Sequence, residues 1–349
     1  MKPVKMTGLL LLLCLLLTQA GCAARPQMQT SVLVVFAMDT SMTLTIYEKD
    51  AEGLLSDCEQ LIIQMNRLLN AHAQRSETYA LSQSNGEPVV LSAAFAEVLA
   101  QALYASELTG GAFDLTIYPL VSLWGFPSDE YRVPTAAELA AALPLVDYTQ
   151  LQFNEAECTA VLPPGMRVDL GGIAKGYTGD LLYDTLQAAG VAALLDLGGG
   201  IVLVGQKPDK TPWRIAVRDP LNTSKHVGVL SLEEGFVQTS GAYERYFEGE
   251  DGVVYHHILD PKTGYPSEGD LASVTVIGRQ GALCDALSTA FFVLGLEESV
   301  RLWRTLEGFE LVLVTKNGDV YITEGIRDRF TPTDNYTDTN VSVLTRSVP

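Results

Sequence analysis

The stretch Val168-Asp169-Leu170-Gly171-Gly172-Ile173-Ala174-Lys175-Gly176-Tyr177 joins a short strand or turn to a helix. We expect this helix to run from about 174 to 189 and to stop at Gly190. The segments that follow are rich in apolar and β-branched residues and predict strands at 193–197, 201–204, 213–217, 227–232, 253–259 and 272–277.

The rest of the chain mixes hairpins with long helices. We expect two strands, at 32–36 and 42–47, around a turn at Asp39, and a hairpin that turns at Asn317-Gly318. Helices are expected at 54–69, 283–294 and 298–305. Two more helices should begin after an N-cap at Ser92 and at a capping box that starts with Thr135. There is no regular strand–helix–strand alternation, so the pattern favours an α+β fold. We expect one domain over residues 31–330, with mixed or antiparallel sheets packed against helices in two intimately associated lobes.

The first 21 residues have the features of a lipoprotein signal peptide. Lys2 and Lys5 precede an apolar run at 9–17, and Gln19-Ala20-Gly21-Cys22 resembles a lipoprotein cleavage site with Cys22 as the lipidated residue. A plain secretory signal with an incidental cysteine is the alternative. We expect a lipid-anchored protein on the extracytoplasmic face of a bacterial membrane, with a tether at 22–30 and a polar C-terminal tail at 331–349.

The composition narrows the range of partners. The formal net charge is −19 at pH 7, and removal of Lys2 and Lys5 would make it −21. Such an acidic surface argues against nucleic acid as a partner. Cys58, Cys158 and Cys284 lack metal-binding spacing, and we expect buried free thiols, although one disulfide is possible.

Two motifs suggest a site for a metal ion and phosphate. Asp285 and Thr289 lie four residues apart in an expected helix, so a carboxylate and a hydroxyl share one face and suit Mg²⁺. Gly171-Gly172 and Lys175 lie at the start of another helix, where backbone N–H groups and a lysine favour anions. Each motif alone also fits a solvated helix start.

Two further motifs suggest acid–base chemistry and an aromatic ligand. His256 and His257 are adjacent, and in an extended strand their side chains point to opposite faces, so at most one can enter a given site. The segment from Gly110 to Phe126 combines glycines with aromatic rings and Asp114. It could cover a planar heterocycle, although an aromatic core cluster is the commoner meaning.

Together these motifs resemble the ApbE family, the FAD:protein FMN transferases. The similarity runs in order through segments 37–40, 110–126, 169–176, 239–245, 256–266 and 285–289. It implies an ApbE-like fold and transfer of FMN from FAD, as substrate, to a threonine hydroxyl of an acceptor protein, with release of AMP. The implied acceptor is an electron-transfer membrane subunit.

The resemblance also implies roles for individual residues. His257 matches the proposed general base. The implied Mg²⁺ ligands are Asp285, Thr289 and the carbonyl of Gly172, with Ser288 nearby. The implied FAD site consists of Met38, Ala112, Phe113, Asp114, Asp169, Lys175 and Ile258, and His72 aligns with the family's flavin-stacking aromatic residue. A Mg²⁺-dependent FAD pyrophosphatase and a non-catalytic flavin-binding lipoprotein remain alternatives.

Overall fold

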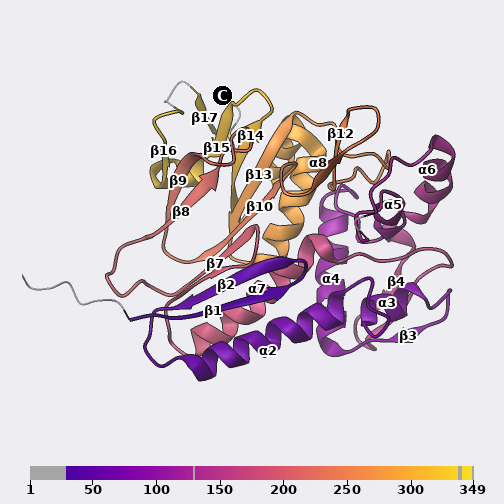
Figure 1. The fold of residues 1–349 in the computed structure, drawn as a ribbon, viewed down its shortest axis with the longest axis horizontal. Coiled ribbons are helices and arrows are strands. Elements are labelled where there is room, and N and C mark those ends of the chain that lie inside the picture. Colours follow the sequence, from indigo (N-terminus) through magenta and orange to yellow (C-terminus); the bar gives the residue numbers. More distant parts are fainter. Residues whose placement is uncertain (1–28, 129, 337–339, 348–349) are drawn as a thin grey trace, which may run out of the picture.

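The computed structural model describes residues 29–128, 130–336 and 340–347, and one large sheet organises them (Figure 1). The sheet order is β1-β2-β6-β7-β10-β13-β14-β15-β17, and every neighbouring pair is antiparallel except β15 and β17. The strands span β1 (Ser31–Ala37), β2 (Thr40–Ile46), β6 (Ala193–Asp196), β7 (Gly200–Val204), β10 (Gly235–Gly241), β13 (Leu271–Gly278), β14 (Phe309–Thr315), β15 (Val320–Thr323) and β17 (Val341–Leu344).

Helices cover one face of this sheet. They are α2 (Glu52–Leu69), α7 (Gly171–Ala188) and α8 (Gly281–Thr305), whereas α4 (Ala93–Leu108) packs on α7 and α8. Leu44 of β2, Ile62 of α2, Leu182 of α7 and Phe291 of α8 are fully buried in one core cluster. The opposite face packs against a small sheet of β8 (Trp213–Arg218), β9 (His226–Leu232) and β16 (Phe330–Pro332).

A second lobe packs against α7 and α8 and lies to the right in Figure 1. It contains α3 (Glu77–Ser82), α5 (Tyr118–Leu123), α6 (Ala136–Ala142), the short helical turns at Leu143–Leu145 and Tyr148–Gln150, and a small sheet of β3 (Val89–Val90), β5 (Thr159–Val161) and β4 (Gln152–Asn154). The hairpin of β11 (Tyr246–Glu248) and β12 (Val254–His256) packs on α5 and α6 through aromatic side chains. The α+β fold in two associated lobes is therefore confirmed.

Some details differ from the expected pattern. Strand β10 was not expected, and the strand expected at 253–259 is only three residues long. The segment at 331–349, expected to be a polar tail, instead contributes β17 to the large sheet, and the guanidinium of Arg346 lies 4.5 Å from the ring centroid of Trp303. Cys22 and the expected signal peptide lie outside the described residues, as does the tether up to residue 28.

The expected thiols and helices are otherwise found. Cys58 and Cys284 are buried free thiols, whereas Cys158 is partly exposed. Helix α8 is interrupted at Gly295, where φ is 76°, between the two helical segments that the sequence predicts. Within the described ranges, every helix is too short or too polar to cross a membrane.

Candidate active site

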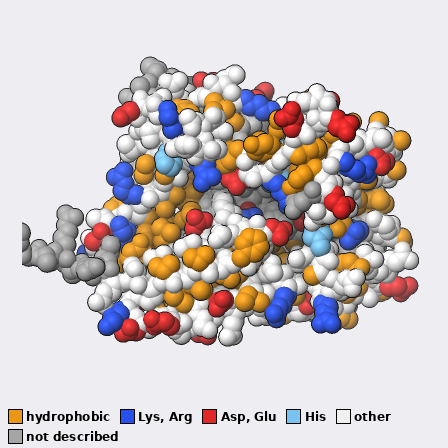
Figure 2. Space-filling view, in the orientation of Figure 1, with side chains coloured by type: hydrophobic (Ala, Val, Ile, Leu, Met, Phe, Trp, Pro, Cys, Tyr) orange, Lys and Arg blue, Asp and Glu red, His pale blue; other side chains and the backbone are white. Residues whose placement is uncertain are grey.

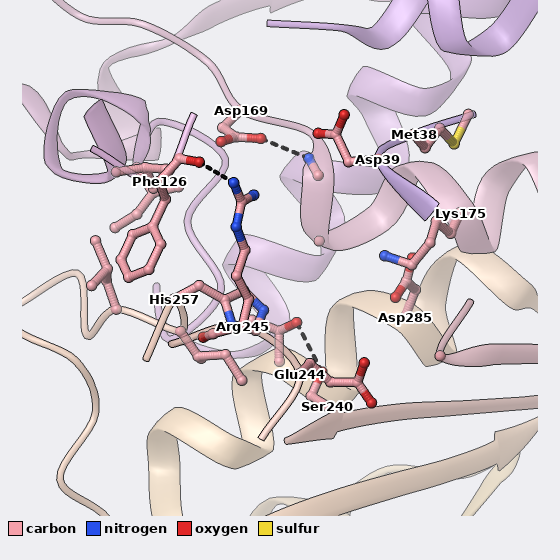
Figure 3. Close-up of a pocket in the computed structure, with 18 of the residues that line it drawn as sticks. Met38, Asp39, Phe126, Asp169, Lys175, Ser240, Glu244, Arg245, His257 and Asp285 are labelled. Carbon is pink, nitrogen blue, oxygen red and sulfur yellow. Dashed lines mark hydrogen bonds between the residues drawn. The ribbon is translucent and has the colours of Figure 1, made fainter. Parts of the chain in front are cut away.

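A cavity of about 770 Å³ lies where the two lobes meet (Figure 3). It opens as a hollow in the middle of the face shown in Figure 2, with acidic and basic side chains around its mouth. The expected site residues that line it are Met38, His72, Ala112, Phe113, Asp114, Asp169, Gly172, Lys175, His257, Ile258, Asp285 and Thr289. The structure thus brings together residues that are spread over 250 positions of sequence.

Two tight turns at one end of the large sheet form a wall of the cavity. Met38 and Asp39 connect β1 to β2 with φ values of 51° and 59°, which define a two-residue hairpin turn in which both residues are left-handed. Gly198 and Gly199 make the equivalent turn between β6 and β7. A Cβ atom on Gly198 would lie 2.1 Å from Oγ1 of Thr40, so only glycine lets the two turns approach so closely.

The N-terminus of α7 points into the cavity. Asp169 accepts a hydrogen bond from the N–H of Gly171 at 2.7 Å, and this contact fixes the turn that begins the helix. Burial raises the pKa of Asp169, although Gly171, His72 and Lys175 lower it in part. Lys175 lies one turn further along α7 and also lines the cavity, so the N-terminal end of this helix and an ammonium group border the same space.

Helix α8 places Asp285 and Thr289 beside this helix start. Oδ2 of Asp285 accepts a hydrogen bond from the N–H of Gly176 at 2.9 Å. A Cβ atom built on Gly172 would lie 3.5 Å from Oγ1 of Thr289, so the hydroxyl of Thr289 lies close to the backbone of Gly172. Burial raises the pKa of Asp285, and the charge of Lys175 lowers it in part.

The expected residue Ser288 does not line the cavity. It is fully buried, its hydroxyl donates to the carbonyl of Asp285 at 2.8 Å, and it lies 2.7 Å from the hydroxyl of Ser240. Ser240 also lies 3.3 Å from the hydroxyl of Thr289 and does line the cavity. Ser288 therefore lies outside the cavity lining, and its hydroxyl is linked to that of Thr289 through Ser240.

These oxygen atoms fit a magnesium ion that is shared with phosphate. Mg²⁺ is commonly held by one or two carboxylates together with substrate phosphates and water. Asp285 supplies a carboxylate, and Thr289 and the backbone of Gly172 supply neutral oxygens. Within the described ranges, no three His, Cys, Asp or Glu side chains form a metal-binding group.

His257 lines the cavity, and its neutral tautomer can accept a proton. Its Nδ1 lies 3.1 Å from the backbone carbonyl of Arg245, and because a carbonyl only accepts, Nδ1 carries the hydrogen and Nε2 presents a lone pair. Burial lowers the pKa of His257 to about 4, and the backbone carbonyl of Arg245 offsets only part of this effect. The imidazole is therefore neutral at pH 7.

His256 points away from the cavity, as the alternation of a strand predicts. It is buried, its Nε2 lies 3.1 Å from the carbonyl of Ser267, and its ring meets Phe292 edge to face. Burial lowers its pKa. Only the second histidine of the pair enters the site.

The aromatic segment both lines the cavity and builds the core. Phe113 and Phe126 face the cavity, whereas Trp124 is fully buried and donates to the carbonyl of Gly264 at 2.7 Å. The carboxylate of Asp114 accepts hydrogen bonds from the N–H groups of Thr116 and Tyr148, so it fixes the cavity wall.

His72 lies at the rim of the cavity. Its Nδ1 is 2.9 Å from the hydroxyl of Tyr118, which orients the ring. Tyr79, the other aromatic residue near this position, is not part of the cavity lining.

Sequence reasoning missed several lining residues. Asp39, Glu244 and Arg245 bring charge to the cavity, and Arg245 donates to the carbonyl of Phe126. The motif 239–245 contains Glu244 and Arg245, but its pattern gave no indication of their roles. The approach of the segment around Phe126, more than 100 residues earlier, was not visible in the sequence.

Comparisons with known proteins agree with this arrangement. The model of the ApbE family matches residues 38–313. A FAD:protein FMN transferase of Klebsiella pneumoniae is 36% identical over 85% of this chain and 93% of its own length, and one of Treponema pallidum is 33% identical over 91% and 93%.

Solved structures give the same result. The crystal structure of the ApbE protein of Thermotoga maritima is 32% identical and superposes with a TM-score of 0.81 over 86% of this chain and 99% of that protein. The flavin transferase ApbE of Vibrio cholerae is 28% identical, with a TM-score of 0.78 over the same shares. The relatives from Klebsiella pneumoniae, Treponema pallidum and Vibrio cholerae are named as flavin or FMN transferases. The chain therefore belongs to the ApbE family.

Proposed function

We propose that this protein is an enzyme that transfers FMN from FAD to a threonine hydroxyl of an acceptor protein in a Mg²⁺-dependent reaction. The observation that carries the proposal is the convergence of Asp285 and Thr289, Lys175 and His257 on one cavity. Its volume of about 770 Å³ lies within the range of about 300 to 1,000 Å³ typical of ligand pockets. The names of the curated relatives support the same substrate.

The residues that line the cavity suit different parts of FAD. The N-terminus of α7 and Lys175 would bind the diphosphate, because both favour negative charge. Met38, Phe113 and His72 supply apolar and aromatic surface for a flat ring system. Asp285, Thr289 and the carbonyl of Gly172 would hold Mg²⁺ against the diphosphate, where the ion would neutralise charge and polarise the phosphorus under attack.

The chain's own residues perform the proton transfer. Nε2 of His257 takes the proton from the threonine hydroxyl, and the threonine oxygen forms a bond to the phosphorus of the FMN half. The bond from that phosphorus to the bridging oxygen breaks, and AMP leaves with the electron pair. The acceptor keeps FMN through a phosphoester, and His257 returns its proton to solvent. Most of the rate enhancement in such phosphoryl transfers comes from positioning and charge stabilisation.

Incubation of a threonine-bearing acceptor with FAD and Mg²⁺ tests the proposal. Mass spectrometry should find FMN on the acceptor threonine and AMP in solution, and EDTA should abolish both. FMN and AMP without labelled acceptor would identify a pyrophosphatase that uses water. FAD binding without AMP release would identify a non-catalytic flavin-binding protein.

We also propose that Cys22 carries a lipid that holds the protein on the extracytoplasmic face of the membrane, where the acceptor would be an electron-transfer membrane subunit. The support is the sequence pattern around Cys22. Metabolic labelling with radioactive palmitate tests it. Label should enter the wild-type protein and not Cys22→Ala, and equal labelling of both would overturn it.

A further inference from the structure

Helix α8 carries the metal-site oxygens, yet it lacks a cap of its own. Gln280 precedes the helix with extended backbone angles, φ −126° and ψ 113°, but its side chain makes no capping hydrogen bond. The first N–H groups of a helix have no partner inside it. Here the N–H of Gly281 donates to Oδ1 of Asp180 at 2.6 Å, and that of Ala282 donates to Oδ2 at 2.8 Å. A carboxylate from α7 therefore caps α8.

Where the two helices come closest, each has a carboxylate that accepts hydrogen bonds from backbone N–H groups of the other. Asp180 of α7 accepts from the start of α8, while Asp285 of α8 accepts from Gly176 near the start of α7. Between these contacts the backbones touch. A Cβ atom on Gly176 would lie 2.1 Å from the carbonyl oxygen of Gly281, and one on Gly281 would lie 2.5 Å from that of Gly176. The pair of contacts fixes how far α8 can slide or rotate against α7.

A cap from α7 is not the least costly way to begin α8. Burial raises the pKa of Asp180 to about 6, and the neighbouring acids Asp184 and Glu97 raise it further, against the two hydrogen bonds that lower it. A Ser, Thr, Asp or Asn at position 280 would accept from the N–H of Ala282 or Leu283 from an exposed loop. Only a cap from α7 also ties one helix to the other.

We propose that Asp180 is a positioning residue that sets the location of the metal-site oxygens of α8 relative to α7. The inference rests on the proposed metal site. Asp285 and Thr289 follow Gly281 by about one and two helical turns, so a displacement at the start of α8 moves both. Gly172, the third expected ligand, lies on α7 and would not move with them.

Direct metal binding separates this role from a purely structural one. Mn²⁺ serves as the probe, and its free concentration is measured by electron paramagnetic resonance in the presence of FAD. Asp180→Asn keeps the shape of the side chain but replaces one accepting oxygen with an NH₂ group, so one of the two hydrogen bonds from Gly281 and Ala282 is lost. Loss of such a supporting contact typically weakens metal binding by about 10- to 100-fold. We expect a loss in this range, with transfer activity restored by excess metal.

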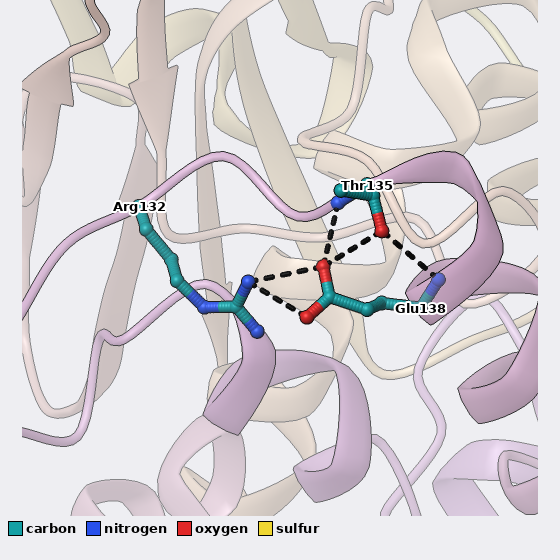
Figure 4. Close-up of polar contacts among 3 residues, drawn as sticks. All are labelled: Arg132, Thr135 and Glu138. Carbon is teal, nitrogen blue, oxygen red and sulfur yellow. Dashed lines mark hydrogen bonds and ion pairs between the residues drawn. The ribbon is translucent and has the colours of Figure 1, made fainter.

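The capping box of α6 provides a matched control (Figure 4). Thr135 accepts from the N–H of Glu138, and Glu138 accepts from the N–H of Thr135 and pairs with Arg132. None of the three residues lines the cavity. Thr135→Ala should lower the melting temperature and leave Mn²⁺ affinity unchanged.

A double variant keeps the test decisive if Asp180→Asn is unstable. Gln280→Asp gives α8 a local cap, so Asp180→Asn with Gln280→Asp should regain the melting temperature but not the Mn²⁺ affinity. Recovery of both, or unchanged affinity in the single variant, would overturn the positioning role while leaving the proposed function intact. Absence of Mn²⁺ binding by the wild-type protein would overturn the metal assignment and this inference together.

Discussion

Replacement of Gly176 by alanine should separate the two helices that carry the proposed metal site. The added Cβ would lie 2.1 Å from the carbonyl oxygen of Gly281 and 2.7 Å from Cβ of Asp285. Ordinary contact begins at 3.4 Å, so α7 and α8 must move apart by roughly 1 Å. Because the neighbour is backbone, rotation of a side chain cannot relieve the clash.

Both stability and catalysis should respond to this displacement. Overpacking of a well-packed core costs about 1 to 3 kcal/mol. A displacement of about 1 Å at a reacting centre can lower the rate by about 100-fold. Since Asp285 accepts from the N–H of Gly176, the carboxylate proposed to bind Mg²⁺ loses this hydrogen bond at the same time. We expect a lower melting temperature and a higher Mg²⁺ requirement for FMN transfer.

Gly53→Ala is the matched control for this experiment. Gly53 lies in α2 with no atom within 4 Å of a built Cβ, so alanine there should be neutral or stabilising by up to about 1 kcal/mol. Thermal unfolding and Mg²⁺ titrations of transfer rate are measured for both variants. If Gly176→Ala behaved like Gly53→Ala in both assays, the close packing of α7 on α8 would not control the site.

Three further predictions follow from individual residues. His257 must be neutral to accept a proton, and burial lowers its pKa to about 4. The transfer rate at saturating Mg²⁺ should therefore fall as the pH drops through about 4. A midpoint near 6.5 would show that burial does not lower this pKa in the complex with FAD, and a rate that does not fall at low pH would contradict the general-base assignment. Asp285→Asn removes the carboxylate of the metal site and should raise the Mg²⁺ concentration for half-maximal rate at least about tenfold, so an unchanged titration would count against that site. Thr135→Ala should cost about 1 kcal/mol in urea unfolding with no change in transfer rate, and a slower rate would mean that α6 influences the cavity.

The sequence could single out most of the expected site residues that line the cavity, because they occur in short local motifs. The spacing of Asp285 and Thr289 already placed both on one helical face, and alternation already separated His256 from His257. Their convergence on one cavity was an implication of family resemblance, since no local pattern encodes contacts between residues so far apart. The place of Arg245 beside Phe126 was missed for the same reason.

The missed elements have physical causes. Strand β10 is covered on both faces, and its Gln238 is 1% exposed, so it lacks the apolar and polar alternation that indicates a strand. Strand β12 ends at His256 because it pairs only with the three residues of β11. The polar composition at 331–349 gave no sign of β17, and no local sequence pattern indicates its parallel pairing with β15.

Anomalous scattering from crystals grown with FAD and Mn²⁺ tests the central claim most directly. The account predicts a Mn²⁺ peak bound by Asp285, Thr289 and the carbonyl of Gly172, in contact with the diphosphate of FAD and on the same side as Nε2 of His257. A peak bound elsewhere, or FAD outside the cavity with its diphosphate far from His257, would contradict it.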